Sequence, residues 1–187
     1  MSIITDTKTL RELELAQRQP NLSFLPFSVL ELLTKIRSDL FPDVHHKVQL
    51  HFINKGPLAC IEYNGESASI YIHQVLNHPD TPFELINLIL KHELLHLRIP
   101  SALVDGKMVQ HPPAFWAAER AIAPERRPAW DWIWWNLEAC LKRRKKLERI
   151  DVRPNWRNVW NRPKTDISHF PYEANLRPKH AEESGGW

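Results

Sequence analysis

The chain of 187 residues contains little cysteine and no long hydrophobic run. Cys60 and Cys140 are too few for a disulfide framework or for a zinc ribbon with four cysteine ligands. The most apolar stretch, residues 83–90, is interrupted by Glu84 and Asn87, so no membrane-spanning helix is predicted. The first residues lack the basic and apolar regions of a signal peptide. We therefore expect a cytoplasmic protein with no membrane partner.

The formal net charge of +3 conceals an uneven distribution. Between residues 141 and 164, ten Lys or Arg stand against two acidic residues, so this segment has a net charge of +8 and the rest sums to −5. Trp156 and Trp160 lie within it, and basic side chains beside aromatic rings suit contact with single-stranded nucleic acid. The alternative is a solvated helix face with the tryptophans packed on the domain. The densest basic run is Lys142, Arg143, Arg144, Lys145 and Lys146.

Hydrophobic periodicity predicts two helices and three strands in the first half of the chain. Apolar residues at helical spacing predict helices over residues 9–19 and 27–40. Alternating apolar residues predict three strands, over residues 47–54, 58–63 and 68–75. Lys55-Gly56-Pro57 and Asn64-Gly65 are turn sequences between them. Strands joined by such tight turns are expected to form a small antiparallel sheet.

A helix that is apolar nearly all round is predicted to follow the sheet. Thr81 is a suitable N-cap, Pro82 suits the first helical position, and Glu84 completes a capping box. The helix is expected to end near Arg98, before Pro100. A helix of this kind is normally buried at the centre of a domain, so its few polar residues require an explanation.

The second half of the chain is predicted to be helical. A loop over residues 100–110 precedes one helix over residues 112–123 and a long helix over residues 128–150. Prolines then break any regular element. We therefore expect an α+β domain over residues 1–150, with the three-stranded sheet packed on the central helix and additional N- and C-terminal helices. A basic tail that contains Pro and Trp follows over residues 151–187.

The polar residues of the central helix form the pattern His92-Glu93-Leu94-Leu95-His96. Residues four apart on an α-helix lie on one face about one turn apart, so the two imidazoles can bind one zinc ion. Glu93 would lie beside the metal, where it can take a proton from a zinc-bound water and pass it to a leaving amine. The pattern therefore predicts a catalytic zinc site with Glu93 as general base. The alternative is a pair of hydrogen-bonded core histidines.

A catalytic zinc ion needs a third protein ligand. His111 lies fifteen residues after His96, just before the next helix, and can fold back onto the central helix. Glu119 is the rival ligand, and its alternative role is to orient a ligating histidine by a hydrogen bond. Asp105 is a less favoured candidate for the third ligand, because Asp-Gly is a common turn sequence.

These motifs resemble the YgjP-like (WLM) and SprT-like zinc metallopeptidase families. The resemblance is carried by residues 92–98, the later histidine and Pro113-Ala114-Phe115-Trp116; it covers about residues 48–123 and is specific only across residues 88–116. It implies a minimal zincin core in which Glu93 is the general base of peptide-bond hydrolysis. The ligands that it implies for zinc are His92, His96 and His111.

The chain also departs from both families. The spacer between His96 and His111 is longer than in YgjP-like members and closer to SprT-like lengths. Gln110 and Pro112 replace the glycines that often flank the third histidine in SprT-like proteins, and the cysteine pairs of a zinc ribbon are missing. SprT-like proteins act on DNA-bound proteins, so the resemblance is a further reason to consider nucleic-acid contact by the basic segment.

Substrate binding is expected at the edge of the sheet. In zincins a peptide commonly pairs with an exposed edge strand. The strand over residues 68–75 immediately precedes the central helix and is predicted to be this edge. Tyr71 and His73 lie on it and are candidates to stabilise a tetrahedral oxyanion. The alternative is that both side chains are packed or solvated.

The sequence therefore predicts a metallopeptidase that hydrolyses protein or peptide substrates with one catalytic Zn²⁺. One alternative is a nucleic-acid-associated, SprT-like protein that acts on DNA-bound proteins. Another is a non-catalytic zinc-binding interaction module. The module would fill the fourth coordination position with a protein ligand, whereas the enzyme would leave this position to water.

Overall fold

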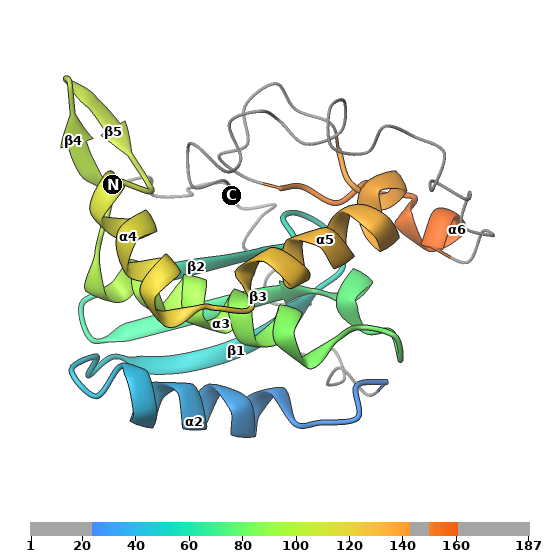
Figure 1. The fold of residues 1–187 in the computed structure, drawn as a ribbon, viewed down its shortest axis with the longest axis horizontal. Helices are drawn as coiled ribbons and strands as arrows, with labels where there is room; N and C mark the ends of the chain where they lie inside the picture. The colour runs from blue at the N-terminus through green and yellow to red at the C-terminus, as the bar shows by residue number, and fades with distance from the viewer. Residues whose placement is uncertain (1–23, 143–149, 161–187) are drawn as a thin grey trace.

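The computed structural model describes residues 24–142 and 150–160. In these residues, five α-helices and a three-stranded sheet form a mixed α+β fold, which confirms the predicted class (Figure 1). The helices are α2 (Val29–Leu40), α3 (Phe83–Arg98), α4 (Pro113–Ile122), α5 (Arg126–Leu137) and α6 (Trp156–Trp160). The strands of the sheet are β1 (Lys47–Ile53), β2 (Ala59–Asn64) and β3 (Ser67–His73). None of the described helices is long and apolar enough to span a membrane.

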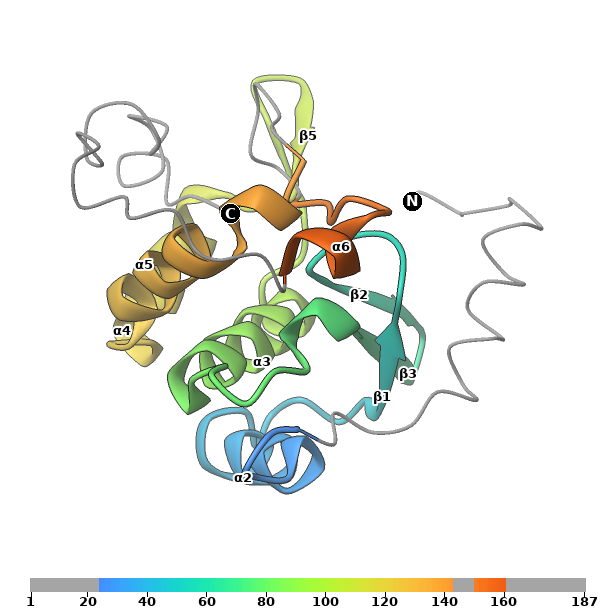
Figure 2. The same cartoon turned by 90° about the vertical axis from the view of Figure 1, so that its right-hand side faces the viewer.

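Helix α3 is the centre of the fold. It lies between the sheet and the α4–α5 pair, with α2 beside it (Figure 2). Its fully buried side chains are Leu85, Ile86, Leu88, Ile89, Leu90 and Leu94. Burial of a leucine or isoleucine side chain contributes about 1.5–3 kcal/mol. The expectation of a buried central helix is therefore confirmed.

The starts of the helices differ in how they are capped. Ser28 caps α2, since its Oγ accepts a hydrogen bond from the backbone N–H of Glu31 at 3.2 Å. The predicted N-cap of α3, Thr81, is wrong: Pro82 is the N-cap and makes no side-chain capping bond. Pro82 has extended backbone (ψ 149°), so the helix begins one residue later than expected. The helix predicted over residues 9–19 lies outside the described residues.

The sheet is mixed, so the prediction of an antiparallel sheet is wrong. Its order is β1-β3-β2, with β3 parallel to β1 and antiparallel to β2. Within this sheet, only β2 and β3 are joined by a tight hairpin turn, which follows Asn64 and contains Gly65 with positive φ. β3 takes the centre because Ala68, Ile70 and Ile72 are buried. The five residues between β1 and β2 then carry the chain past β3 to the far edge of the sheet.

β3 is therefore the central strand, and the prediction that it is the substrate-binding edge is wrong. The edges are β1 and β2. Alternation along β3 places Ile70 and Ile72 in the main core, whereas Tyr71 packs in a separate small cluster with Ile53. The side chain of Tyr71 thus lies on the opposite face of the sheet from the main core.

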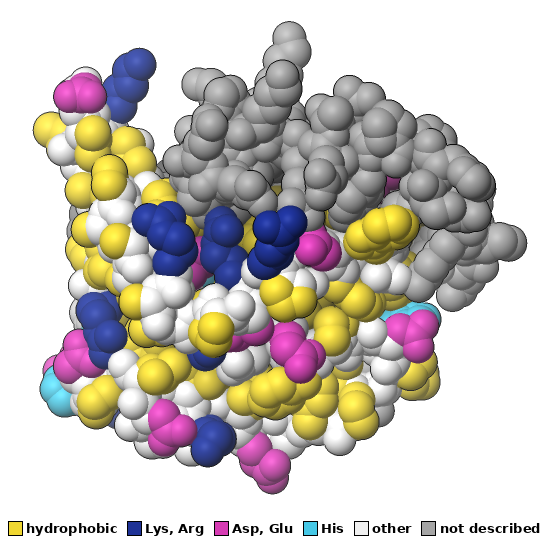
Figure 3. All heavy atoms as spheres, viewed as in Figure 1, with side chains coloured by type: hydrophobic (Ala, Val, Ile, Leu, Met, Phe, Trp, Pro, Cys, Tyr) yellow, Lys and Arg dark blue, Asp and Glu magenta, His cyan; other side chains and the backbone are white. Residues whose placement is uncertain are grey.

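The segment between α3 and α4 contains a small hairpin, where the sequence predicted only a loop. β4 (Ala102–Val104) pairs with β5 (Lys107–Val109) across a turn in which Asp105 and Gly106 have positive φ. Leu103 and Met108 face each other and are 70% and 63% exposed. Hydrophobic side chains run along this hairpin where it projects from the body (upper left in Figure 3). The strands were missed because each has only three residues.

Helix α5 ends at Leu137, so the predicted helix over residues 128–150 is too long. A 3₁₀ turn, Glu138–Cys140, follows, and Leu141 then forms a β-bridge with Val152. Leu141 and Val152 are both buried in the core. Burial of this pair in the core favours an end of the helix before Leu141, whatever the local helix propensity.

Residues 150–160 pack onto the core. The backbone carbonyl of Ile150 accepts a hydrogen bond from the N–H of Leu58 at 2.7 Å. Trp156, on α6, is buried in the main core, and so this part of the predicted tail carries a short helix rather than only extended chain. Residues 161–187 lie outside the described residues.

This packing makes α6 part of the stable fold. Trp156 is 6% exposed, and its ring meets the His73 ring at 5.5 Å between centroids. We predict that Trp156→Ala lowers the free energy of unfolding by about 3–5 kcal/mol, because it leaves a cavity. Trp135, which is 43% exposed, is the control, and Trp135→Ala should cost less than about 1 kcal/mol. Equal losses in chemical denaturation would contradict the assignment of α6 to the core.

Candidate metal centre

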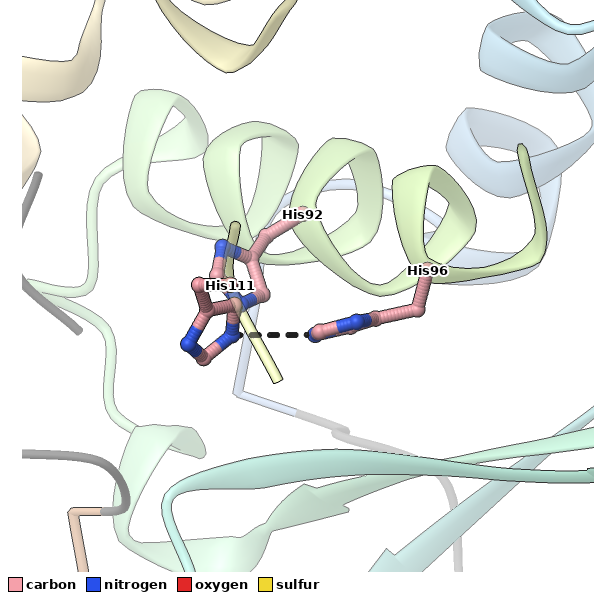
Figure 4. Close-up of side chains that lie close together, drawn as sticks. All are labelled: His92, His96 and His111. Carbon is pink, nitrogen blue, oxygen red and sulfur yellow. Dashed lines mark hydrogen bonds between the residues drawn. The ribbon is translucent and has the colours of Figure 1, made fainter. Parts of the chain in front are cut away.

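Three histidines converge on one point beside α3. His92 and His96 come from α3, and His111 reaches back from just before α4 (Figure 4). The Nε2 atoms of His92 and His111 are 3.2 Å apart, and those of His111 and His96 are 3.1 Å apart. His92, His96 and His111, called the histidine cluster below, lie close enough together to bind a metal ion.

The spacing of these nitrogens fits a small tetrahedral ion. Tetrahedral zinc binds imidazole at about 2.0–2.1 Å, so neighbouring ligand nitrogens lie about 3.3 Å apart. The observed separations of 3.1 and 3.2 Å are within a few tenths of an ångström of that value. All of the donor atoms are imidazole nitrogens, which suit zinc and other late transition metals better than calcium or magnesium. The residues present therefore fit zinc.

Glu119 contacts a member of the cluster from behind instead of joining it. Its Oε1 lies 2.6 Å from His92 Nδ1, on the side of the ring away from His111. The Nδ1–H donates to the carboxylate, which leaves the lone pair of Nε2 free for a metal. The structure thus brings His111, and not its rival Glu119, into the histidine cluster, and places Glu119 against the far nitrogen of His92.

Two aromatic side chains, Phe115 and Trp116, pack against the histidine cluster. Phe115 is fully buried, and its ring centroid lies 4.9 Å from His92, 4.6 Å from His96 and 4.9 Å from His111. Trp116 packs against His111 at 4.8 Å. Helix α4 supplies both rings, because residues just inside its start face α3. These rings exclude water from one side of the cluster and hold the imidazoles in place.

Burial keeps all three imidazoles neutral. It lowers the pKa of His92 to about 3, with help from the charge of Arg126. Burial likewise lowers the pKa of His96 to about 2 and that of His111 to about 3, with smaller effects from the neighbouring histidines. The neutral imidazole is the form that binds a metal, so the cluster does not have to lose protons at neutral pH.

Glu93 is buried on α3, next to His92 in the sequence. Burial, and secondly the charge of Glu119, raises the pKa of Glu93 to about 8. The described residues offer its carboxylate no hydrogen bond or ion pair. A buried carboxyl without a partner costs free energy, and a cation beside it would favour its ionised form. Such a group is suited to exchange protons near neutral pH.

The structure does not bring the other predicted site residues to the cluster. Tyr71 stacks on His51, with 5.1 Å between ring centroids. His73 lies under Trp156, and its Nδ1 accepts a hydrogen bond from the N–H of Val75. Neither side chain is described in contact with the three histidines. Lys142 is the only member of the predicted basic run within the described residues; Arg143, Arg144, Lys145 and Lys146 lie outside them.

Sequence reasoning missed the groups behind Glu119. Arg126 Nε donates to Glu119 Oε2 at 2.7 Å, and Lys91 Nζ pairs with Glu125 Oε1 at 2.7 Å. Lys91 and Arg126 are both mostly buried in apolar surroundings, which is unusual for a cation. The sequence did offer one signal, since Lys91 and Glu119 stand inside strongly apolar helices. Their partners Glu125 and Arg126 lie beyond the helix break at Pro124, so the pairs could not be predicted.

Comparison of the chain with protein-family models, with curated proteins and with solved structures finds no match in any of the three. The resemblance to YgjP-like and SprT-like metallopeptidases therefore rests on the motif residues alone. The features that bear on function are the geometry of the histidine cluster and the position of Glu93.

Proposed function

We propose that the protein is a zinc-dependent metallopeptidase with His92, His96 and His111 as ligands and Glu93 as general base. The single observation that carries this proposal is the convergence of three imidazoles, in which His111 Nε2 lies 3.2 Å from His92 Nε2 and 3.1 Å from His96 Nε2, with Glu93 one residue after His92. The finer zincin arrangement and the identity of the metal are part of the same proposal.

The chain's own residues divide the work of hydrolysis. When bound, zinc supplies Lewis acidity, which polarises a peptide carbonyl and makes a coordinated water acidic. Glu93 accepts a proton from the attacking water and delivers it to the amine that leaves. Glu119 keeps the Nδ1 of His92 protonated, and Phe115 keeps bulk water from one side of the site.

A catalytic role is favoured over a closed interaction module. Three ligating residues gather in the part of the chain that the structure describes, and no fourth His, Cys, Asp or Glu joins them there. His96 and His111 are partly exposed, so a water and a substrate carbonyl can approach from their side. An open fourth position is typical of catalytic zinc.

The first prediction from this proposal concerns the metal itself. Purified protein should bind one Zn²⁺ per chain, and His96→Ala or His111→Ala should weaken binding by more than about 100-fold, because each removes a ligand. The measurement is competition for Zn²⁺ with a chromophoric chelator. The exposed His45 provides the control, and His45→Ala should bind zinc as the wild type does. Equal loss in all three variants, or no binding by the wild type, would refute the site.

The second prediction concerns catalysis. Glu93→Gln should retain zinc but lower the rate of hydrolysis of an unstructured protein substrate by at least about 100-fold, since it removes the general base. Cleavage is followed by the appearance of new amino termini, with zinc content measured on the same sample. Glu84, exposed at the start of α3, gives the matched control Glu84→Gln, which should cleave at the wild-type rate. A fully active Glu93→Gln variant would overturn the peptidase proposal.

The third prediction follows from the raised pKa of Glu93. In the metal-free protein this pKa rises from 4.5 to about 8 on folding, so the folded state holds a proton that the unfolded state has lost. The stability of the wild type relative to Glu93→Gln should therefore fall as pH rises from 4.5 to 8, whereas the lowered pKa values of the three histidines affect both proteins alike. Glu93→Gln cannot ionise and should be more stable than the wild type at pH 8, by a margin that shrinks toward pH 4.5. Denaturant unfolding with a chelator present measures this; parallel pH curves would contradict it.

A further inference from the structure

Two buried charged side chains, Glu119 and Arg126, lie one behind the other on the far side of His92 from the other two histidines. The Glu119 side chain is fully buried, with one oxygen on His92 Nδ1 at 2.6 Å and the other on Arg126 Nε at 2.7 Å. Arg126 is itself mostly buried, with 17% of its side chain exposed. A buried carboxylate keeps a fixed orientation only when both of its oxygens are held. Arg126 holds the oxygen that His92 does not use.

We propose that Arg126 is a positioning residue of the metal centre, which acts through Glu119 on the ring of His92. The guanidinium fixes the plane of the Glu119 carboxylate, and the carboxylate fixes the rotation of the His92 ring and the direction of its Nε2. The inference rests on the metal-binding part of the proposed function and does not depend on peptidase activity.

Arg126 touches the support of a second ligand as well. Its guanidinium carbon lies 5.8 Å from the centre of the Trp116 ring, and the Trp116 ring packs on His111 at 4.8 Å. One side chain therefore contacts groups behind two of the three ligands. A planar guanidinium can bind a carboxylate edge and lie over an aromatic face at once, which an ammonium group does poorly.

A second buried ion pair lies beside Arg126, at the corner between α4 and α5. Arg126 is the first residue of α5, and Glu125 precedes it. Glu125 Oε1 binds Lys91 Nζ and Asn87 Nδ2, each at 2.7 Å, and Lys91 Nζ also donates to the carbonyl of Ile122 at 2.8 Å. These bonds fasten the corner to α3.

The same corner thus contains two buried ion pairs with different connections. Arg126–Glu119 leads to the Nδ1 of His92, whereas Lys91–Glu125 joins α3 to the corner and ends there. Replacement of either cation by Met leaves a buried carboxylate without that partner. Both changes should destabilise the fold, but only the first should disturb the metal. Lys91→Met is therefore a matched control for Arg126→Met.

The test compares three variants of the full chain with the wild type: Arg126→Met, Arg126→Lys and Lys91→Met. Zn²⁺ affinity is measured by chelator competition, and Co²⁺ is added to the metal-free protein to record its visible ligand-field spectrum. We expect Arg126→Met to weaken Zn²⁺ binding by about 10–100-fold and to shift the Co²⁺ spectrum. Lys91→Met should bind within about twofold of the wild type and keep its spectrum, even where its unfolding midpoint falls equally.

Arg126→Lys keeps the charge but not the planar group, and so it should weaken Zn²⁺ binding by about tenfold. This variant decides the question if Arg126→Met does not fold. Wild-type affinity and an unchanged Co²⁺ spectrum in the Arg126 variants would overturn the positioning role alone. Equal loss of affinity in Lys91→Met would also overturn it, since the effect would then be structural. Absence of metal binding by the wild type would refute the proposed function together with this inference.

Discussion

The structure depends on the burial of polar and charged groups within an otherwise apolar helix. Helix α3 is packed on nearly all sides, yet Lys91, His92 and Glu93 are buried in it. Desolvation of such groups is costly unless each finds a partner. Glu125 and Glu119, beyond the end and near the end of α4, supply the partners of Lys91 and His92. These polar contacts therefore add to the apolar packing that holds α4 and α5 on α3.

Glu93 is the exception, and this exception is informative. It shares the burial of its neighbours, but no partner for it is described. A structural role would be met better by an apolar or neutral residue at this position, because burial raises the pKa of Glu93 to about 8. Natural proteins tolerate such unfavourable groups mainly where function requires them. The destabilised carboxyl and the three converging nitrogens thus support the same interpretation.

The site could be predicted from sequence more fully than the fold. His92 and His96 are four residues apart on one helix, so their proximity is a local property, and His111 needed only one short return of the chain. The strand order could not be predicted, because the central place of β3 depends on the burial of Ile70 and Ile72 in the assembled core. The contact of Arg126 with Glu119 escaped prediction because it spans the break between two helices.

The central claim is that three imidazoles hold a zinc ion with one position left for water. X-ray absorption at the zinc edge of the wild-type protein tests it most directly, since it counts and identifies the ligating atoms. The account predicts three imidazole nitrogens and one further light atom, all at about 2.0–2.1 Å. A sulfur ligand, a fourth imidazole, or a six-coordinate shell without imidazole scattering would contradict it.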